Sequence, residues 1–227
     1  KHVNPFAPAA LAVCLGVAAG GALVRHALAL RASRALVARA EAAAWSTTTL
    51  AAGPRSVRLI VSHALEGTPF TGGLFEPYVV FPKSTWDALG DDERDAALAH
   101  ELAHVREGHV LVASLSRLVC AAFVFVPFVR RAEARLRDAL EAAADERAVA
   151  DGACPYALAS ALVRVREHVR ASARPPALAL GACHGSLGAR VADLLEAPVP
   201  APRAQVGAGL LVAALVGLVV FRSLVLP

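Results

Sequence analysis

Two long apolar stretches lie near the ends of the 227-residue sequence. Residues 8–30 consist mainly of Ala, Leu, Val and Gly, and residues 206–226 are a similar run. About 20 apolar residues in a helix are enough to cross a bilayer, so both stretches are predicted to be transmembrane helices. Residues 197–205 contain three prolines, and they predict a stiff linker before the second of these helices.

Between these stretches, the pattern of apolar positions predicts helices and a small sheet. Residues 57–62 and 78–81 are rich in the β-branched and aromatic residues typical of strands. Pro77 and Pro82 bracket the second strand and favour an edge position, because proline cannot donate a hydrogen bond to a neighbouring strand. Helices are expected at residues 91–108, 131–150, 155–172 and 187–195. The predicted fold class is therefore a mainly α membrane protein with a small β-sheet.

The composition also favours a membrane protein. Hydrophobic residues make up 56% of the chain, which exceeds the usual share in soluble domains. The basic residues form no stripe interleaved with aromatic side chains, so a nucleic-acid partner is not expected. Arg25, Arg31, Arg34 and Arg39 follow the first apolar stretch, and the positive-inside rule places this side in the cytoplasm. The sequence begins at Lys1 and contains no methionine, so we expect a fragment or a processed form.

Residues 100–104 read His-Glu-Leu-Ala-His within a predicted helix. Residues four apart lie on one face of a helix, so the imidazoles of His100 and His104 can reach the same metal ion. Glu101 points about 100° away around the helix, toward a water molecule at the open coordination position. There it can act as the general base of a metallopeptidase, and this set of residue types predicts a Zn²⁺ cofactor.

A catalytic zinc ion usually has a third protein ligand, which is expected downstream of His104. Glu107 and His109 lie on the same helix or at its end, and they cannot easily close the far side of the ion. Glu141 and Asp145 share a face of the next predicted helix, which suits one ligand and one carboxylate that holds a ligand imidazole. The remaining acidic and histidine candidates are Glu133, Asp138, Glu146, Asp151, Glu167, His168 and His184.

The predicted metal site constrains a third apolar stretch, residues 110–129. If this stretch crossed a bilayer once, Glu141 would emerge on the opposite side from the two histidines. Arg117 lies within the stretch, where a charge is costly at mid-membrane, and Pro127 interrupts its helical pattern. We therefore expect a helical hairpin at residues 109–131 that turns near Pro127 and returns to the side it left.

These motifs resemble those of membrane gluzincins. The His-Glu-x-x-His motif is followed by Glu-x-x-x-Asp at residues 141–145. Residues 68–82 begin Thr-Pro-Phe-Thr-Gly and end Val-Val-Phe-Pro, and they are similar to a segment of the BlaR/MecR-type peptidase family. His184, followed six residues later by Arg190, resembles a segment of the related HtpX and CAAX prenyl protease family.

The resemblance covers about residues 55–195. It implies a zincin-like metallopeptidase domain, placed at residues 45–196 and flanked by the two transmembrane helices. It implies that Glu101 is the catalytic base and that Asp145 supports a ligand from outside the coordination sphere. The implied metal ligands are His100, His104 and Glu141. The implied lining of the substrate cleft is Tyr78, Val79, Val80, His184 and Arg190.

The expected function is a membrane-bound zinc endopeptidase that cleaves a protein substrate, such as a transcriptional repressor. The expected location is the cell membrane, with several spans in the lipid bilayer and the catalytic domain facing the cytoplasm. One alternative is a quality-control protease of the HtpX type. Another is a non-catalytic membrane signal transducer that retains the metal site. The sequence has no Ser-x-x-Lys motif, so β-lactam sensing is not expected of this chain.

Overall fold

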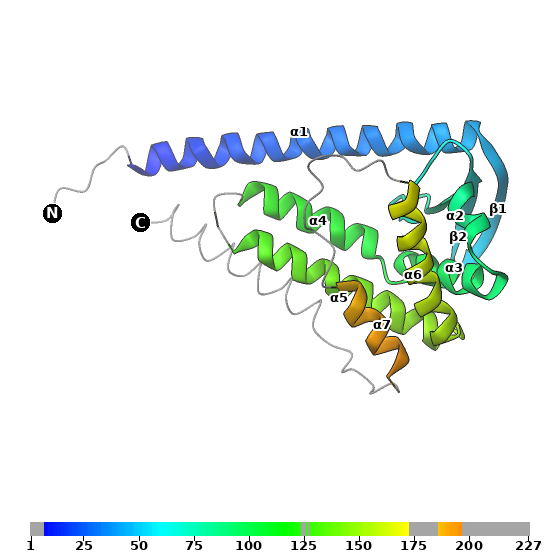
Figure 1. Cartoon of the computed structure of the whole chain (residues 1–227). Helices are drawn as coiled ribbons and strands as arrows, with labels where there is room; N and C mark the ends of the chain where they lie inside the picture. The colour runs from blue at the N-terminus through cyan, green and yellow to red at the C-terminus, as the bar shows by residue number, and fades with distance from the viewer. Residues whose placement is uncertain (1–6, 124–125, 127, 173–185, 197–227) are drawn as a thin grey trace.

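The computed structural model describes residues 7–123, 126, 128–172 and 186–196. This part of the chain is mainly helical with one small sheet, as the sequence pattern predicts (Figure 1). The strands are β1 (Ala44–Ala52), β2 (Arg55–Ser62), β3 (Phe70–Gly72) and β4 (Tyr78–Pro82). The helices are α1 (Ala7–Ala42), α2 (Lys83–Ala88), α3 (Asp91–Arg106), α4 (His109–Ala122), α5 (Val129–Ala150), α6 (Pro155–Ser172) and α7 (Ser186–Leu195).

The four strands have the order β1-β2-β4-β3. Strand β4 pairs in parallel with β2 and antiparallel with β3, so the predicted edge position of this strand is wrong. Pro77 precedes β4 and Pro82 is its last residue, and the N–H groups between them remain able to pair. The short strand β3 therefore occupies the end of the sheet.

The central strands of the sheet are buried on both faces. Val61 and Phe81 belong to a core cluster on the side that α3 and α6 cover. Ile60 and Val80 point to the opposite face and pack near Val37 of α1. Successive side chains of a strand alternate between faces, which explains how two short strands supply both cores. The sheet is thus held between α1 and the helices that follow it.

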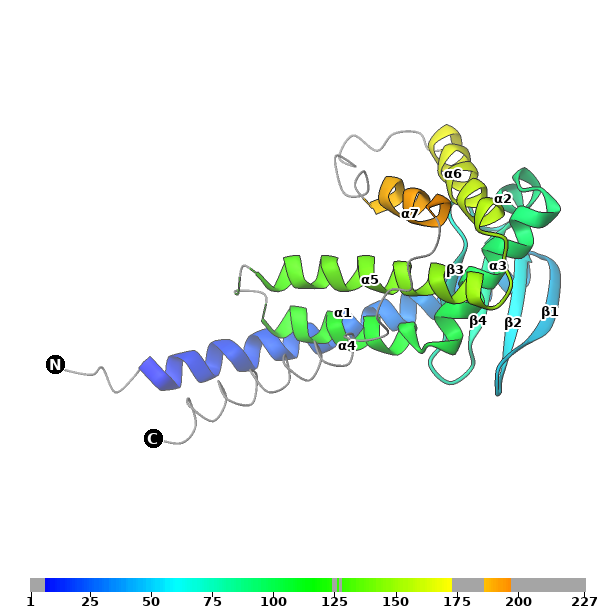
Figure 2. The ribbon, with the colours of Figure 1, turned by 90° about the horizontal axis from the view of Figure 1, so that it is seen from below.

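Helices α1, α4 and α5 extend from the sheet in the same direction (Figures 1 and 2). α1 contacts α4, and α4 contacts α5. α4 runs away from the sheet, and α5 returns along it until it contacts α3. As a result, α5 packs against α3, the helix that precedes α4 in the chain.

No helix in the described part of the chain is both long enough and apolar enough to cross a membrane. This finding overturns the predicted fold class in which transmembrane helices flank the catalytic domain. Residues 8–30 do not form a separate apolar helix, because α1 has 36 residues and continues to Ala42. Arg25 interrupts its apolar run, and further arginines follow. The stretch at residues 206–226 and the linker at 197–205 lie outside the described residues.

The turn between β3 and β4 depends on a glycine. Gly73 has φ of +82°, and a Cβ there would overlap the carbonyl oxygen of Glu76. Gly53, between β1 and β2, also has a positive φ of +62°, but a Cβ there would meet no atom within 4 Å. The two positions therefore separate the cost of the backbone conformation from the cost of a steric overlap.

We predict that Gly73→Ala lowers the free energy of unfolding by about 3 kcal/mol, near the upper end of ordinary point substitutions. Gly53→Ala should cost about 1 kcal/mol, because it introduces only the left-handed conformation. Urea unfolding of both variants beside the wild type measures the difference. Equal losses in the two variants would show that the overlap with Glu76 is relieved without cost.

Candidate metal centre

Helix α3 has well-defined ends that fix the orientation of its histidines. At its start, the backbone N–H of Gly90 donates to Oε2 of Glu93 at 2.8 Å, and the first turn is acidic. At its end, Gly108 adopts a left-handed conformation with φ of +69°, which no regular helix continues. His100 and His104 lie one turn apart between these ends and face the same way. Both imidazoles therefore lie side by side on one face of α3.

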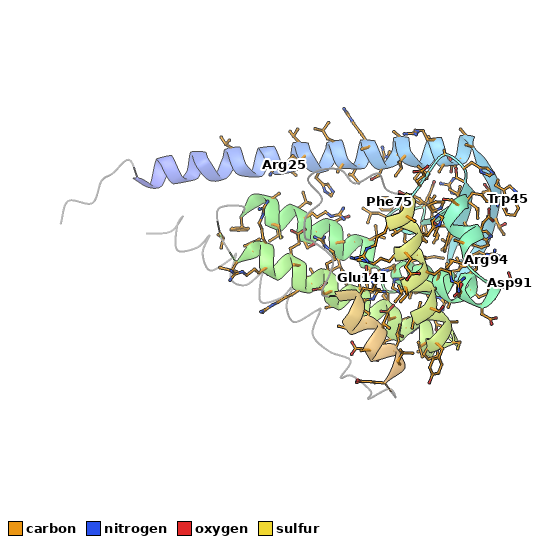
Figure 3. All side chains as sticks on the ribbon, viewed as in Figure 1. Arg25, Trp45, Phe75, Asp91, Arg94 and Glu141 are labelled. Carbon is orange, nitrogen blue, oxygen red and sulfur yellow. The ribbon has the colours of Figure 1, made fainter. Side chains whose placement is uncertain are left out.

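α5 brings a carboxylate to this surface. The ligand atoms of His100, His104 and Glu141 all lie within 4.8 Å of one another. The Nε2 atoms of the two histidines are 3.1 Å apart, and they lie 3.5 and 3.8 Å from the oxygens of Glu141. Glu141 projects from the part of α5 that passes α3 (Figure 3). The structure thus brings together the three residues predicted as ligands, although their coordination of a metal stays a prediction.

The donor set suits a catalytic metal ion. Two imidazole nitrogens and one carboxylate oxygen are typical ligands of zinc, and three protein ligands leave a coordination position open. Nδ1 of His100, the ring nitrogen that faces away from Glu141, lies 2.8 Å from Oδ1 of Asp145. This contact has ion-pair distance but not hydrogen-bond geometry, and the buried Nδ1 has no other partner. Asp145 thus lies within reach of His100, and its role in orienting that ring stays a prediction.

Arg190 on α7 connects both carboxylates of α5. Its Nε and Nη2 donate to the two oxygens of Asp145 at 2.6 and 2.8 Å, which is a bidentate pair. Its Nη1 donates to Oε2 of Glu141 at 2.9 Å. Arg190, predicted to line the substrate cleft, thus contacts the candidate metal ligand and its supporting carboxylate. No local sequence pattern indicates this pairing, because 45 and 49 residues separate the partners.

The charges of the site shift its protonation. Burial opposes the charged form of His100, but the neighbouring Asp145 and Glu141 outweigh it and raise the pKa of His100 to about 9. Burial also opposes the charged form of Glu141, yet His100 and Arg190 lower its pKa to about 2. Burial and the positive charge of His100 lower the pKa of His104 to about 4. The carboxylates thus attract one positive charge to the position that a metal cation would take.

Glu101 has a neighbour that the motif alone does not reveal. The hydroxyl of Thr71, on β3, lies 2.6 Å from Oε2 and 3.0 Å from the backbone oxygen of Glu101, and can donate to either. Burial raises the pKa of Glu101, and the charge of His100 and the Thr71 hydroxyl oppose this rise. Thr71 belongs to the Pro-Phe-Thr-Gly segment, but nothing in that segment indicates contact with a residue 30 positions away.

The other residues predicted for the cleft have different positions. Val79 and Val80 are fully buried on β4 and point into the two opposite cores. Tyr78 packs edge-on against Phe70, with ring centroids 6.5 Å apart. His184 lies outside the described residues. The strand residue whose side chain bonds to Glu101 is Thr71, which lies on β3 and not on β4.

Comparison with known proteins gives one family. A family model described as BlaR1 peptidase M56 matches residues 6–194. The resemblance to the BlaR/MecR-type peptidases is confirmed by this match, whereas the relation to the HtpX and CAAX prenyl protease family stays a prediction. No curated protein matches the chain, and neither does any solved structure.

We predict that Arg190→Leu destabilises the metal-free protein by about 3 kcal/mol at pH 7, because it leaves two largely buried carboxylates without their arginine. The pKa values of Glu141 and Asp145 are lowered in the folded state, so their contribution is present above about pH 4.5. That contribution is lost as the pH falls toward 2. The wild type should therefore lose stability in this range more steeply than Arg190→Leu.

Urea midpoints at pH 7, 5 and 3 with a chelator present measure both effects. Arg135→Leu, at an exposed position on α5, is the matched control and should follow the wild type. Identical acid dependence of Arg190→Leu and the wild type would show that Arg190 does not lower the pKa of these carboxylates.

Proposed function

Because the chain belongs to the BlaR1 peptidase M56 family, we propose that it is a zinc-dependent endopeptidase that hydrolyses peptide bonds of a protein substrate. One observation carries the proposal: the ligand atoms of His100, His104 and Glu141 converge within 4.8 Å. Glu101 lies next to His100 on the same helix, and a purely structural metal site would not need this carboxylate. A regulatory protein such as a repressor is the proposed substrate class, on the strength of the family resemblance.

In this proposal His100, His104 and Glu141 hold the metal. When bound, the metal polarises the scissile carbonyl and makes water acidic enough to react near neutral pH. Glu101 accepts a proton from the attacking water and passes it to the leaving amine. The Thr71 hydroxyl limits the orientations available to the Glu101 carboxylate, because the two lie within hydrogen-bond distance.

The same strand that carries Thr71 is suited to hold the substrate. β3 is the last strand of the sheet order and contacts α3. An extended peptide can add to the edge of a sheet through main-chain hydrogen bonds. A substrate bound along β3 would pass Thr71 and hence the carboxylate of Glu101. Binding through the main chain also fits an endopeptidase, which must hold peptide on both sides of the cleaved bond.

We predict that Glu101→Gln abolishes proteolysis but leaves the metal content unchanged, since the amide keeps the shape of the side chain and cannot accept the proton. General base catalysis is worth about 10²- to 10⁴-fold in rate, so turnover should fall by at least that much. Glu107→Gln is the control: Glu107 is exposed at the end of α3, and its variant should keep full activity. Casein cleavage and elemental analysis of the purified protein measure both quantities.

Persistent cleavage by Glu101→Gln would contradict the proposed base. Loss of metal in this variant would instead assign Glu101 to the coordination of the ion. Glu141→Ala should lose the metal and the activity together, because it removes the only proposed ligand from α5.

We further propose that the protein acts at the cell membrane with its site on the cytoplasmic side. Leu111, Leu115 and Val119 of α4 are exposed by 51, 46 and 44%, and their spacing places them on one face of the helix. Leu23 and Leu28 on α1 are also exposed. A row of exposed apolar side chains supports contact with lipid acyl chains. Exposed arginines at positions 31, 34 and 39 of α1 suit the anionic headgroups of the cytoplasmic leaflet, which supports the cytoplasmic side.

We predict that Leu111→Ser combined with Leu115→Ser lowers the fraction of protein that floats with vesicles of phosphatidylethanolamine and phosphatidylglycerol. The double variant removes apolar area from the face of α4, and about 25 cal/mol is lost for each Å² no longer buried. Val163→Ser, at an exposed position on α6, is the control and should not change flotation. Equal flotation of the double variant and the wild type would contradict a lipid-contacting role of α4.

A further inference from the structure

His109 lies against the outer edge of a candidate ligand. It is the first residue of α4, and only 7% of its surface is exposed. Its Nδ1 atom lies 2.9 Å from Nδ1 of His104, and the two ring planes meet at 72°. The left-handed conformation of Gly108 ends α3 and turns the chain so that His109 returns onto α3. A buried histidine in this position can form a hydrogen bond with the ring of His104.

The protonation of the ring nitrogens determines which of the two histidines donates the hydrogen bond between the rings. Nε2 of His104 faces His100 and Glu141, so its lone pair must be free if it is to bind a metal. The proton of a neutral His104 ring must then sit on Nδ1. Nδ1 of His109 must therefore accept that proton, and the ring of His109 carries its own proton on Nε2. Only this pair of tautomers satisfies both a metal ligand and the 2.9 Å contact.

We propose that His109 is a positioning residue that sets the tautomer and the ring orientation of His104 for metal binding. In this role His109 orients the ring of His104 as Asp145 is predicted to orient the ring of His100. Oδ1 of Asp145 lies 2.8 Å from Nδ1 of His100. Partners of this kind tune metal affinity by fixing the ligand ring before the ion arrives. The inference rests on the proposed metal centre and adds a residue that the centre itself does not include.

His109 is not a fourth ligand. Its contact is with the nitrogen of His104 that points away from Glu141. Among the described residues, the donor atoms that converge within 4.8 Å come from His100, His104 and Glu141 and do not include His109. Its effect on the metal must therefore pass through the ring of His104.

The test compares Zn²⁺ affinity, measured by competition with a chelator, for three substitutions. In His109→Asn, the side-chain oxygen occupies the place of Nδ1 and can accept the same hydrogen bond. In His109→Gln the acceptor lies one bond farther out, and in His109→Leu there is none. We expect Gln and Leu to weaken Zn²⁺ binding by about 10- to 100-fold, and Asn to stay within a few-fold of the wild type.

The readouts separate positioning from packing. Visible absorption of the Co²⁺-loaded protein reports the ligand geometry, and it should change in His109→Gln and His109→Leu but not in His109→Asn. His63→Leu, at an exposed position, is the control and should match the wild type. If His109→Leu does not fold, the comparison of the two amides still decides, because only Asn keeps the acceptor in place.

Two outcomes overturn the inference alone: wild-type affinity in His109→Leu or His109→Gln, or an equal loss in Asn and Gln. The second would show that ring volume matters rather than the acceptor. If the wild type itself binds no Zn²⁺, the proposed metal centre is wrong and this inference falls with it. The affinity of the wild type therefore distinguishes failure of the proposed function from failure of the role of His109.

Discussion

The carboxylates of Glu141 and Asp145 hold three separate helices against one another. They lie on α5, and they face His100 of α3 and Arg190 of α7. Largely buried charges of one sign are tolerated only with partners of the opposite sign. If any of the three helices moved away, it would leave a largely buried charge without its partner, which would destabilise the fold. The residues of the candidate site therefore also contribute to the packing of the helices. Its charges specify how α3, α5 and α7 are arranged.

The sheet has a supporting role in the same arrangement. Its central strands fill cores on two faces, which fixes α1 on one side and α3 on the other. The short end strand β3 then meets α3 at Thr71, beside Glu101. α5 thereby covers the side of α3 that carries the candidate metal ligands, while β3 of the sheet contacts the side that carries Glu101. Contacts with α5 and with β3 thus orient α3 from two directions. α3 carries both the candidate base, Glu101, and two of the candidate ligands.

Parts of this arrangement follow from local sequence periodicity. The spacing of His100 and His104 predicts one shared face, and the helix that carries Glu141 is evident from its pattern. The ion pairs of Arg190 and the contact between Thr71 and Glu101 depend on tertiary packing, which no local pattern encodes. Pro77 and Pro82 suggested an edge strand because proline lacks a backbone N–H, but at the strand ends they leave the N–H groups between them free to pair on both sides. The apolar run of α1 suggested a separate transmembrane helix because the pattern does not show that α1 continues past it.

The left-handed turn at Gly108 has a mechanical consequence. α4 has 14 residues and therefore a length of about 21 Å, and its exposed apolar face lies along this length while His109 lies at its first residue. α4 therefore joins an exposed apolar surface and a neighbour of a candidate metal ligand in one continuous helix. A displacement of α4 relative to α3 would consequently also shift the His109 ring relative to His104.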